Sequence, residues 1–550
     1  MSKQAIKKYS IVDLFAGAGG LSCGFIQTGR FTVKAAFEMN PNAQQTYLRN
    51  HSIDKSCMYS DVSDALSDET KKKLGEIDIV IGGPPCQGFS NANRQKNHII
   101  NINNSLVKKY VKTVLHLNPK AFLMENVSML QSEVHRFYIS EEDATDIQEY
   151  SLVTTDSQIQ LLEGEFVFDG VIDIVSNSNL IAKYLWDEND YLALNVLFKN
   201  RNNKEKLKVA LLKHQRRLIA FAEKLTACEG DNYIIQQGWI TGNALRQYFD
   251  NNITDGLCEA IKPSVSLQRM LSKAKEIKDH AIAVKRFSVD DGVIAHVQSM
   301  AILDYIISIL GAGCDGYTID KGILSAAAFG VPQKRMRYII LGIKKSIADC
   351  VELPNGMIEE GEFRTVRDAI WDLEEIVTTT DVAEGSKGVS IGEAPTGTSA
   401  LGLSLRDSVI LCNHVSTETT ELALERFRAI KQGQNFHSLP EELKKSYSDS
   451  KRTQNTIYLR LMYNEPSGTV VNVRKSMWIH PVLHRALSIR EAARLQTFPD
   501  SFVFCGSKNS QYQQVGNAVP PILAKAIAEY LCNYLDKSPH KSTFGNCIME

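Results

Sequence analysis

The chain has 550 residues, of which 43% are hydrophobic and 23% charged, and this composition predicts a folded protein of several domains. The 62 basic residues almost balance the 63 acidic ones, which excludes a globally basic protein, so any nucleic-acid site must concentrate positive charge locally. The eleven cysteines form no CxxC pair, the N-terminus does not resemble a signal peptide, and no apolar run approaches the roughly 18 residues of a membrane span. We therefore expect a cytoplasmic protein that makes no membrane contact.

Strand-like and helix-like patterns alternate through the first 130 residues. Four buried-strand patterns, separated by helical ones, are YSIVDLFAG, TVKAAFEMN, IDIVIGGPP and KAFLMENV. This alternation predicts an α/β fold with a doubly wound, parallel, Rossmann-like sheet. Ligands bind such sheets at the carboxyl ends of the strands, and the unusual residues of this chain follow those strands.

Two later regions have a different character. Residues 131–315 are polar and helix-rich, and residues 376–410 are rich in Gly, Ser and Thr, which predicts a long loop. Within the first region, residues 205–225 place apolar side chains at helical spacing on one face and basic side chains on the other. We favour a packing helix with a solvated basic face, and a surface that contacts phosphates is the alternative.

A glycine-rich turn and two acidic residues indicate a nucleotide-like ligand. DLFAGAGG places glycines between a strand and a helix, where the backbone can approach a ligand closely. Glu38 could accept both hydroxyls of a ribose, and Asp61 could accept from an adenine amino group, although an acid at a strand end is often a helix cap. The combination predicts an adenosine cofactor, with S-adenosylmethionine and NAD as candidates.

The segment IGGPPCQGFS holds Cys86 between prolines and glycines, residues that fix an unusual loop conformation. Glu125, in MENV, ends the following strand of the predicted sheet and should face the same cleft. A rigidly held thiol beside an adenosine site is a candidate nucleophile. Dehydrogenases rarely need such a pair, so Cys86 and Glu125 favour S-adenosylmethionine over NAD.

Six segments resemble the DNA cytosine-5 methyltransferase family of bacterial restriction-modification systems. They occur in the family's order and are DLFAGAGGLSCGF, GGPPCQGFS, MENV, FGVPQKRMRYIILG, SIREAARLQTFPD and QVGNAVPP. The resemblance implies an S-adenosylmethionine-dependent DNA (cytosine-5) methyltransferase that flips its target base out of the duplex.

The resemblance also assigns roles in catalysis. Cys86 would attack C6 of the cytosine and form a covalent adduct, while Glu125 would stabilise or protonate N3. Arg335 and Arg337 would reach O2 of the base and neighbouring groups. Because they alternate in QKRMR, we expect them to lie on one strand and to face one side. The sequence does not identify the base that removes the C5 proton.

The same resemblance predicts which residues bind the cofactor S-adenosylmethionine, whose product is S-adenosylhomocysteine, and it implies no metal. The predicted cofactor-binding residues are Phe15, Gly17, Gly19, Gly20, Leu21, Glu38, Asp61, Val62, Pro84, Asn517 and Val519.

The predicted organisation divides the chain into six segments. Residues 1–130 and 316–345 form the catalytic domain, which residues 516–538 complete as a C-terminal helix. The other segments are an insertion of unknown role (131–315), a smaller target-recognition domain (346–515) and a tail (539–550). Few residues separate the MENV and QKRMR segments in compact members of the family, so the insertion is a departure from the family's pattern.

The expected partners are double-stranded DNA and a companion restriction endonuclease. We expect a monomer, with the insertion as a possible oligomer or partner contact. A transfer-RNA cytosine-5 methyltransferase is the alternative enzyme, and a catalytically silent DNA-binding regulator is the alternative outside catalysis. A silent relative should lack Cys86, Glu125 or an arginine of QKRMR, and all are present. An NAD enzyme is disfavoured by PPCQ and QKRMR.

Overall fold

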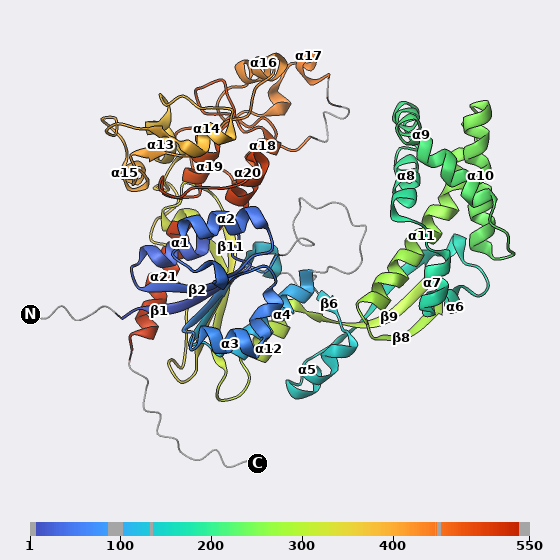
Figure 1. Ribbon diagram of the computed structural model, residues 1–550, viewed down its shortest axis with the longest axis horizontal. Coiled ribbons are helices and arrows are strands. Elements are labelled where there is room, and N and C mark those ends of the chain that lie inside the picture. Colours follow the sequence, from blue (N-terminus) through green and yellow to red (C-terminus); the bar gives the residue numbers. More distant parts are fainter. Residues whose placement is uncertain (1–6, 86–102, 132–135, 446, 448–452, 538–550) are drawn as a thin grey trace, which may run out of the picture. The chain divides into compact units, whose positions relative to one another are not determined.

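The computed structural model describes residues 7–85, 103–131, 136–445, 447 and 453–537. This part of the chain divides into two compact units, the first formed by residues 7–85, 103–131 and 306–537 and the second by residues 136–305. Each unit has its own sheet and its own helices (Figure 1).

A seven-stranded sheet forms the centre of the first unit, with strand order β10-β11-β5-β4-β1-β2-β3. Its strands are β1 (Tyr9–Leu14), β2 (Phe31–Phe37), β3 (Met58–Tyr59), β4 (Ile79–Gly82), β5 (Ala121–Val127), β10 (Tyr317–Ser325) and β11 (Met336–Lys344). Strands β1 to β5 pair in parallel, whereas β11 is antiparallel to both β5 and β10. The doubly wound α/β class is confirmed. The parallel pairing expected for the strands of the first 130 residues is observed for β1 to β5, and the antiparallel strands β11 and β10 extend the sheet beyond β5.

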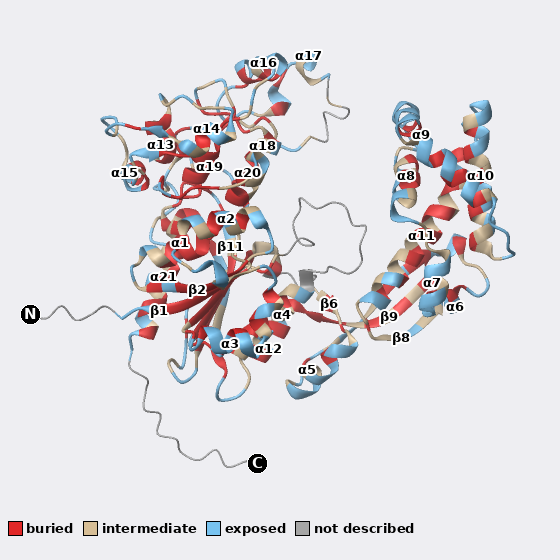
Figure 2. Cartoon of the chain, in the orientation of Figure 1, coloured by how far each residue is buried: buried red, intermediate tan, exposed pale blue. Residues whose placement is uncertain are grey.

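Helices flank this sheet. They are α1 (Gly20–Gln27), α2 (Pro41–Asn50), α3 (Asp68–Leu74), α4 (Asn103–Leu117) and α21 (Pro521–Leu535), and α12 (Ile302–Leu310) spans the boundary between the units. Strand β1 is buried along its whole length, as YSIVDL predicts, and Figure 2 shows the sheet as the most buried layer. Helices α1 and α21 share one core with the sheet. A Cβ on Gly24 would stand 2.3 Å from the carbonyl oxygen of Pro521, so these two helices touch backbone to backbone.

Residues 346–515 belong to the same compact unit and contain short elements joined by long irregular segments. These are α13 (Val366–Ile370), α14 (Val382–Lys387), β12 (Val389–Ser390), α15 (Ala400–Leu405), β13 (Ile410–Leu411), α16 (Glu421–Ala429), α17 (Glu441–Lys444), α18 (Val473–Ser476), α19 (Ile489–Leu495) and α20 (Lys508–Asn517). The predicted loop at 376–410 thus includes α14, β12 and α15. Composition could not reveal these elements because each is only two to six residues long.

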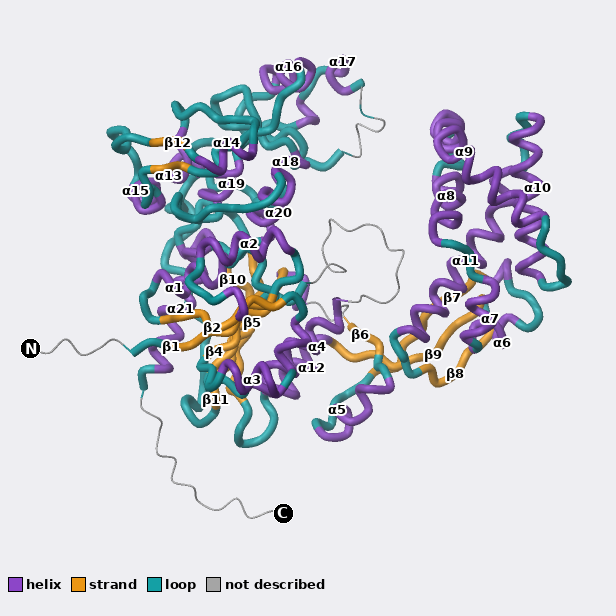
Figure 3. The backbone as a smooth tube through the Cα atoms, viewed as in Figure 1, coloured by secondary structure: helices purple, strands orange, loops and turns teal. Residues whose placement is uncertain are grey.

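The second unit combines a small antiparallel sheet with a group of helices (Figure 3). The strands are β6 (Arg136–Tyr138), β7 (Thr155–Glu163), β8 (Val284–Val289) and β9 (Gly292–Ala301). The helices are α5 (Ala144–Glu149), α6 (Val171–Ser176), α7 (Ser178–Tyr184), α8 (Glu188–Lys199), α9 (Lys204–Thr226), α10 (Tyr233–Asn251) and α11 (Leu257–Asp279). The amphipathic pattern at 205–225 is confirmed, because α9 buries its predicted apolar face against α8, α10 and α11. The sheet was not expected from the polar sequence.

Among the residues that the structure describes, no helix is both long and apolar enough to cross a membrane.

Candidate active site

The glycine-rich turn after β1 passes through three left-handed residues before α1 begins. The φ angles are 57° at Phe15, 56° at Gly17 and 90° at Gly19. Phe15 has a Cβ and still adopts this conformation, which is uncommon outside glycine and indicates a turn held by its surroundings. A Cβ on Gly17 would meet nothing within 4 Å. The backbone therefore curls beside open space directly ahead of the first turn of α1, as a ligand cradle requires.

Glu38 follows β2 and holds this turn in place. Its Oε2 accepts a hydrogen bond from the backbone N–H of Gly17 at 2.8 Å, and its Oε1 accepts from Asn40 N–H at 2.7 Å. An ionised carboxylate has about four acceptor positions, so both oxygens retain capacity for further donors. The structure thus brings together Gly17 and Glu38, the predicted glycine loop and the predicted ribose acid.

Asp61 follows β3 and caps a short 3₁₀ turn. Its Oδ1 accepts from Ser63 N–H at 2.8 Å, and Lys109 of α4 lies with Nζ 3.8 Å away. The hydrogen bonds from Ser63 lower the pKa of Asp61 below its usual value, so this carboxylate is an acceptor at neutral pH. The neighbouring Val62 is buried. Asp61 is therefore a helix cap, the alternative that the sequence left open, and its side chain is 63% exposed.

The C-terminal segment closes on the glycine loop. A Cβ on Gly20 would stand 2.5 Å from the carbonyl oxygen of Val519 and 3.0 Å from Phe498. A Cβ on Gly19 would stand 2.2 Å from His51 Nε2, so both glycines permit close packing. Leu21 is buried next to them, and Asn517 ends α20 with an exposed side chain. Phe498 is a contact that the sequence did not predict, although its motif was recognised.

Cys86 lies outside the described residues, which end before it at Pro85. The residues just before Cys86 are described: Pro84 is buried, and its carbonyl oxygen accepts a hydrogen bond from Asn126 Nδ2 at 3.2 Å. Asn126 also accepts from Val127 N–H through its own Oδ1. This asparagine, the middle residue of ENV, connects β5 to Pro84, a role that the motif alone did not reveal.

Glu125 and Arg337 form an ion pair near the carboxyl end of β5. Ile339 of β11 is paired with Glu125 of β5, which places Arg337 on the same face and one step along. The Nε of Arg337 lies 2.5 Å from Glu125 Oε1, and each side chain is 13% exposed. A Cβ on Gly83 would stand 2.9 Å from Glu125 Oε2. One carboxylate oxygen is therefore held by Arg337 while the other faces the segment that leads into Cys86.

Arg335 occupies a different environment from Arg337. Strand β11 begins at Met336, so the two arginines do not share the strand as expected. The Arg335 guanidinium is buried and donates to the carbonyl oxygens of Val470 at 2.9 Å and Gly516 at 3.1 Å. Its Nε–H has no hydrogen-bond partner among the described residues. Burial, and then the charge of Arg337, lower its pKa well below the usual value.

The charged residues of SIREAARLQTFPD are fully buried, and they pair with one another, with Asp372 and with Arg485. Arg494 donates from Nη1 to Asp372 Oδ1 and from Nη2 to Asp500 Oδ2, each at 2.5 Å. Glu491 pairs with Arg485 through both oxygens, and it also completes the capping box of α19 with Ser488. Burial alone would raise the pKa of Glu491, but the charge and hydrogen bonds of Arg485 hold it below its usual range. This motif builds structure.

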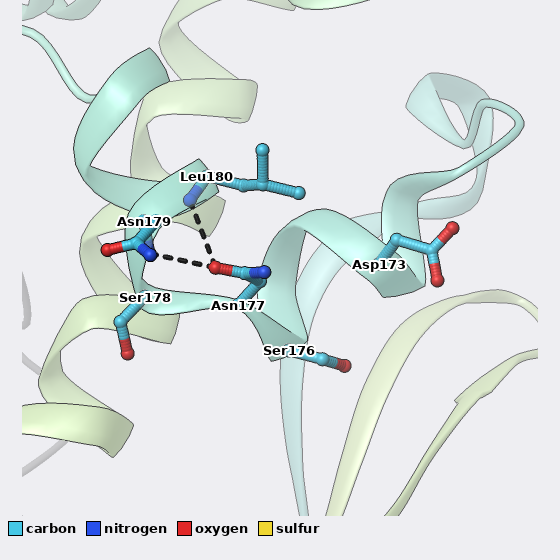
Figure 4. A pocket seen from close by; sticks show the side chains of 6 residues that line it. All are labelled: Asp173, Ser176, Asn177, Ser178, Asn179 and Leu180. Atoms are coloured by element: carbon cyan, nitrogen blue, oxygen red, sulfur yellow. Dashed lines mark hydrogen bonds between the residues drawn. The ribbon is translucent and has the colours of Figure 1, made fainter.

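A polar hollow in the second unit is lined by residues of α6 and α7 (Figure 4). Asn177 lies between these helices, and its Oδ1 accepts from the backbone N–H groups of Asn179 at 2.9 Å and Leu180 at 3.3 Å. These helix-end donors are thus already satisfied by a side-chain cap. Neither of these two N–H groups is left to bind a ligand in the hollow.

The fold and the edge residues together define an α/β enzyme domain with a nucleotide-type loop beside a carboxylate and arginine pair. Residues 9–144 and 301–533 match the family model described as C-5 cytosine-specific DNA methylase, which is more than half of the chain. The protein therefore belongs to the C-5 cytosine-specific DNA methylase family.

Individual relatives are similar over nearly the whole chain. The Type II methyltransferase M.DdeI of Desulfomicrobium norvegicum is 24% identical over 543 residues, which span 96% of this chain and 89% of the relative. The Type II methyltransferase M.AgeI of Thalassovita gelatinovora is 26% identical over 94% of this chain and 98% of its own. A crystal structure of a DNA modification methyltransferase encoded within an E. coli prophage superposes with a TM-score of 0.53 at 20% identity, covering 96% of this chain and 100% of that one. The last likeness bears on the fold alone.

Proposed function

We propose that this protein transfers a methyl group from S-adenosylmethionine to C5 of a flipped-out cytosine in a specific duplex sequence, through a covalent bond between Cys86 and C6. The observation that carries the proposal is the position of Glu125. Arg337 holds one of its oxygens at 2.5 Å, and the other faces Gly83 in the segment that leads into Cys86. Glu125, the proposed general acid, therefore lies near the carboxyl end of β5, between the arginine that orients it and the segment that precedes the proposed nucleophile.

The residues around the glycine loop fit S-adenosylmethionine. The open space beside Gly17 suits a close approach by the ligand, and the Glu38 carboxylate retains acceptor capacity for two ribose hydroxyls. Asp61 presents an exposed carboxylate for an adenine amino group. Phe15, Gly19, Gly20, Leu21, Val62, Pro84, Asn517 and Val519 complete the proposed cofactor surface. When bound, the cofactor supplies an electrophilic methyl group on a sulfonium sulfur.

Cys86 begins the reaction by forming an S–C6 bond, which moves the C5=C6 electron pair toward C5 and makes N3 more basic. Glu125 shares a proton with N3 as this charge grows, and Arg337 keeps its carboxyl group oriented. C5 then takes the methyl group while the methyl–sulfur bond breaks and the sulfur keeps the electron pair. Loss of the C5 proton to a base restores the double bond and releases Cys86 as a thiolate.

Arg335 acts in this proposal next to the reacting base. Its two bonds to Val470 and Gly516 fix the guanidinium, and the unpartnered Nε–H offers a donor to O2 of the cytosine. A buried donor without a partner costs about 1–3 kcal/mol, so an acceptor at this position would be bound favourably.

Sequence readout and a protective role complete the proposal. A cytosine inside a duplex cannot expose C6 to a nucleophile, so it must leave the stack at a cost of a few kcal/mol. We assign recognition of the flanking bases to residues 346–515, and modification in a restriction system with a companion endonuclease to the whole chain. The names of the relatives above support this assignment, since both are type II methyltransferases.

The test is methyl transfer with labelled S-adenosylmethionine on mixed-sequence duplex DNA, followed by base-by-base mapping of 5-methylcytosine. We expect methylation at one short sequence, and its loss in Cys86→Ala. A duplex with 5-fluorocytosine at the mapped position should trap a denaturant-stable adduct, because fluorine at C5 cannot leave as a proton does. Cys57→Ala, which changes a cysteine that the site does not use, is the matched control.

Three outcomes would overturn the proposal. Methylation of transfer RNA but not of duplex DNA would favour the alternative enzyme. Specific DNA binding without methylation by the wild-type protein would indicate a silent regulator. Full activity in Cys86→Ala would exclude the covalent route.

A further inference from the structure

Charge is unevenly distributed over the second unit. Residues 136–305 contain 25 acidic and 19 basic residues, so this part of the chain is acidic overall. Residues 199–224 alone hold nine of the basic residues and only two of the acidic ones. Most of this positive charge lies on α9, whose opposite face is buried (Figure 2).

The cations of α9 form a stripe along one side of the helix. Lys206, Lys213, Arg217 and Lys224 are separated by seven, four and seven residues, which brings them within about 20° of one line on an α-helix of 3.6 residues per turn. All four are exposed. At a rise of about 1.5 Å per residue the stripe is roughly 27 Å long. We call these four residues the basic stripe.

The lysines of the basic stripe are not neutralised within the unit. Arg217 pairs with Asp190 at 2.9 Å and with Asp187 at 3.6 Å. Among the described residues, Lys206, Lys213 and Lys224 form no ion pair. The two glutamates of α9, Glu205 and Glu223, lie about 100° around the helix from the stripe.

The surface beside the stripe extends this positive region. Arg216 and His214 line a depression together with Lys213, Arg217 and Lys224 of the stripe, and Asp190, the partner of Arg217, lines it as well. Like charges on one side of a helix repel and lower its stability slightly, so a packing role does not require them. The buried residues of α9 already provide the packing.

We propose that the basic stripe binds the phosphate backbone of duplex DNA, as an accessory contact in a segment that the family model does not cover. The proposal rests on the proposed function only in taking duplex DNA as the substrate. DNA carries one negative charge per about 1.7 Å of its axis, so a straight row of lysines meets phosphates without reading the sequence. In a protein of net charge −1, this row supplies one local region of positive potential that can attract DNA.

The test compares two triple variants of the full-length protein with the same change in net charge. Lys206→Ala, Lys213→Ala and Lys224→Ala remove the free lysines of the stripe, and alanine favours helix. Lys183→Ala, Lys275→Ala and Lys278→Ala remove exposed lysines from α7 and α11 of the same unit. Binding to duplexes with and without the methylation site is measured between about 50 and 200 mM salt. Circular dichroism confirms folding of each variant.

We expect the stripe variant to bind both duplexes at least about tenfold more weakly, with the slope of log K against log salt reduced by about 2–3. The control variant should match the wild type, and Lys→Arg changes at the three stripe positions should retain binding. Methyl transfer at saturating DNA should be unchanged in the stripe variant. Equal binding by the stripe and control variants would overturn the proposal, as would a loss of turnover with binding intact. Failure of the proposed function would instead appear as absent methylation by the wild-type protein.

Discussion

An ion pair and a three-residue ionic network in the first unit differ in burial, and the difference distinguishes residues of the proposed active site from residues that stabilise the fold. Glu125 and Arg337 lie at the sheet edge, and each keeps 13% of its side chain exposed. Arg494 and its partners Asp372 and Asp500 have almost no exposed surface, and Arg494 binds both carboxylates. Asp372 also binds Arg406 at 2.9 Å. Glu125, Arg337, Arg494 and Asp500 all come from the motifs identified in the sequence, whereas Asp372 lies outside them. The difference is that Glu125 keeps one oxygen free of the cation, whereas the buried network uses every charge internally.

The largest effect expected on activity is that of Glu125→Gln. The amide can still accept the Arg337 hydrogen bond, so we expect a stability change of only about 1 kcal/mol. It cannot supply a proton to N3, and the rate of methyl transfer should fall about 10²- to 10⁴-fold. Single-turnover transfer at saturating cofactor and DNA measures the rate, and urea unfolding measures stability. A large loss of stability without loss of rate would place Glu125 with the architectural pairs.

Arg494→Met should have the opposite profile. It leaves Asp500 buried without its close cation, while Asp372 keeps Arg406 at 2.9 Å. We expect the free energy of unfolding to fall by about 3–5 kcal/mol, mainly through Asp500. Arg428→Met is the matched control, because Arg428 pairs with Glu421 at 3.5 Å on the surface and should contribute less than about 1 kcal/mol. Urea unfolding of both variants gives the comparison. Similar losses in the two would show that burial is not what distinguishes the pairs.

The sequence predicted what local pattern controls. Glu38, which follows β2, and Glu125, near the carboxyl end of β5, could be placed because parallel strands bring their carboxyl ends to one edge of the sheet. The amphipathic helix at 205–225 was likewise visible in its periodicity. The antiparallel strand β10 was missed, because its burial does not alternate regularly along YTIDKGILS and its place in the sheet depends on pairing with β11.

The arrangement of the site was less predictable because it depends on contacts between distant segments. Arg335 and Arg337 look equivalent in QKRMR, yet one is buried against Val470 and Gly516 while the other reaches Glu125. No spacing rule distinguishes them, because the difference comes from where the chain returns some 135 and 181 residues later. Asn126 was overlooked for the same reason.

Asp13 is a buried carboxylate with no cation partner among the described residues. It therefore shows what burial does to a carboxyl group when no arginine compensates its charge. Its Oδ2 accepts from Ser22 Oγ at 2.6 Å, and burial raises the pKa of Asp13 to about 7. The folded state then binds a proton that the unfolded state releases near pH 4, so stability should fall as pH rises between about 4 and 7, by up to about 1.4 kcal/mol per unit.

Asp13→Asn should remove this contribution to the pH dependence. Urea unfolding at a series of pH values between about 4.5 and 8 measures it, and Asp68→Asn at the exposed start of α3 serves as the control. The expected result is a shallower decline for Asp13→Asn than for the wild type and the control. Parallel profiles for all three proteins would mean that Asp13 titrates alike in the folded and unfolded states.

The smallest effect separates a glycine of the site from a glycine of the scaffold. Gly17 and Gly29 have φ angles of 56° and 73°, and a Cβ on either would meet nothing within 4 Å. Alanine at either position should therefore lower the stability of the folded state by about 1–2 kcal/mol through backbone strain. Only Gly17→Ala places a methyl group in the proposed cofactor cradle. We expect this methyl group to weaken the binding free energy of S-adenosylmethionine by about 1.4 kcal/mol, which calorimetric titration would record as a roughly tenfold weaker affinity. If both variants bound the cofactor as the wild type does, the open space beside Gly17 would not be its site, and Glu38 would be an architectural residue like Glu491.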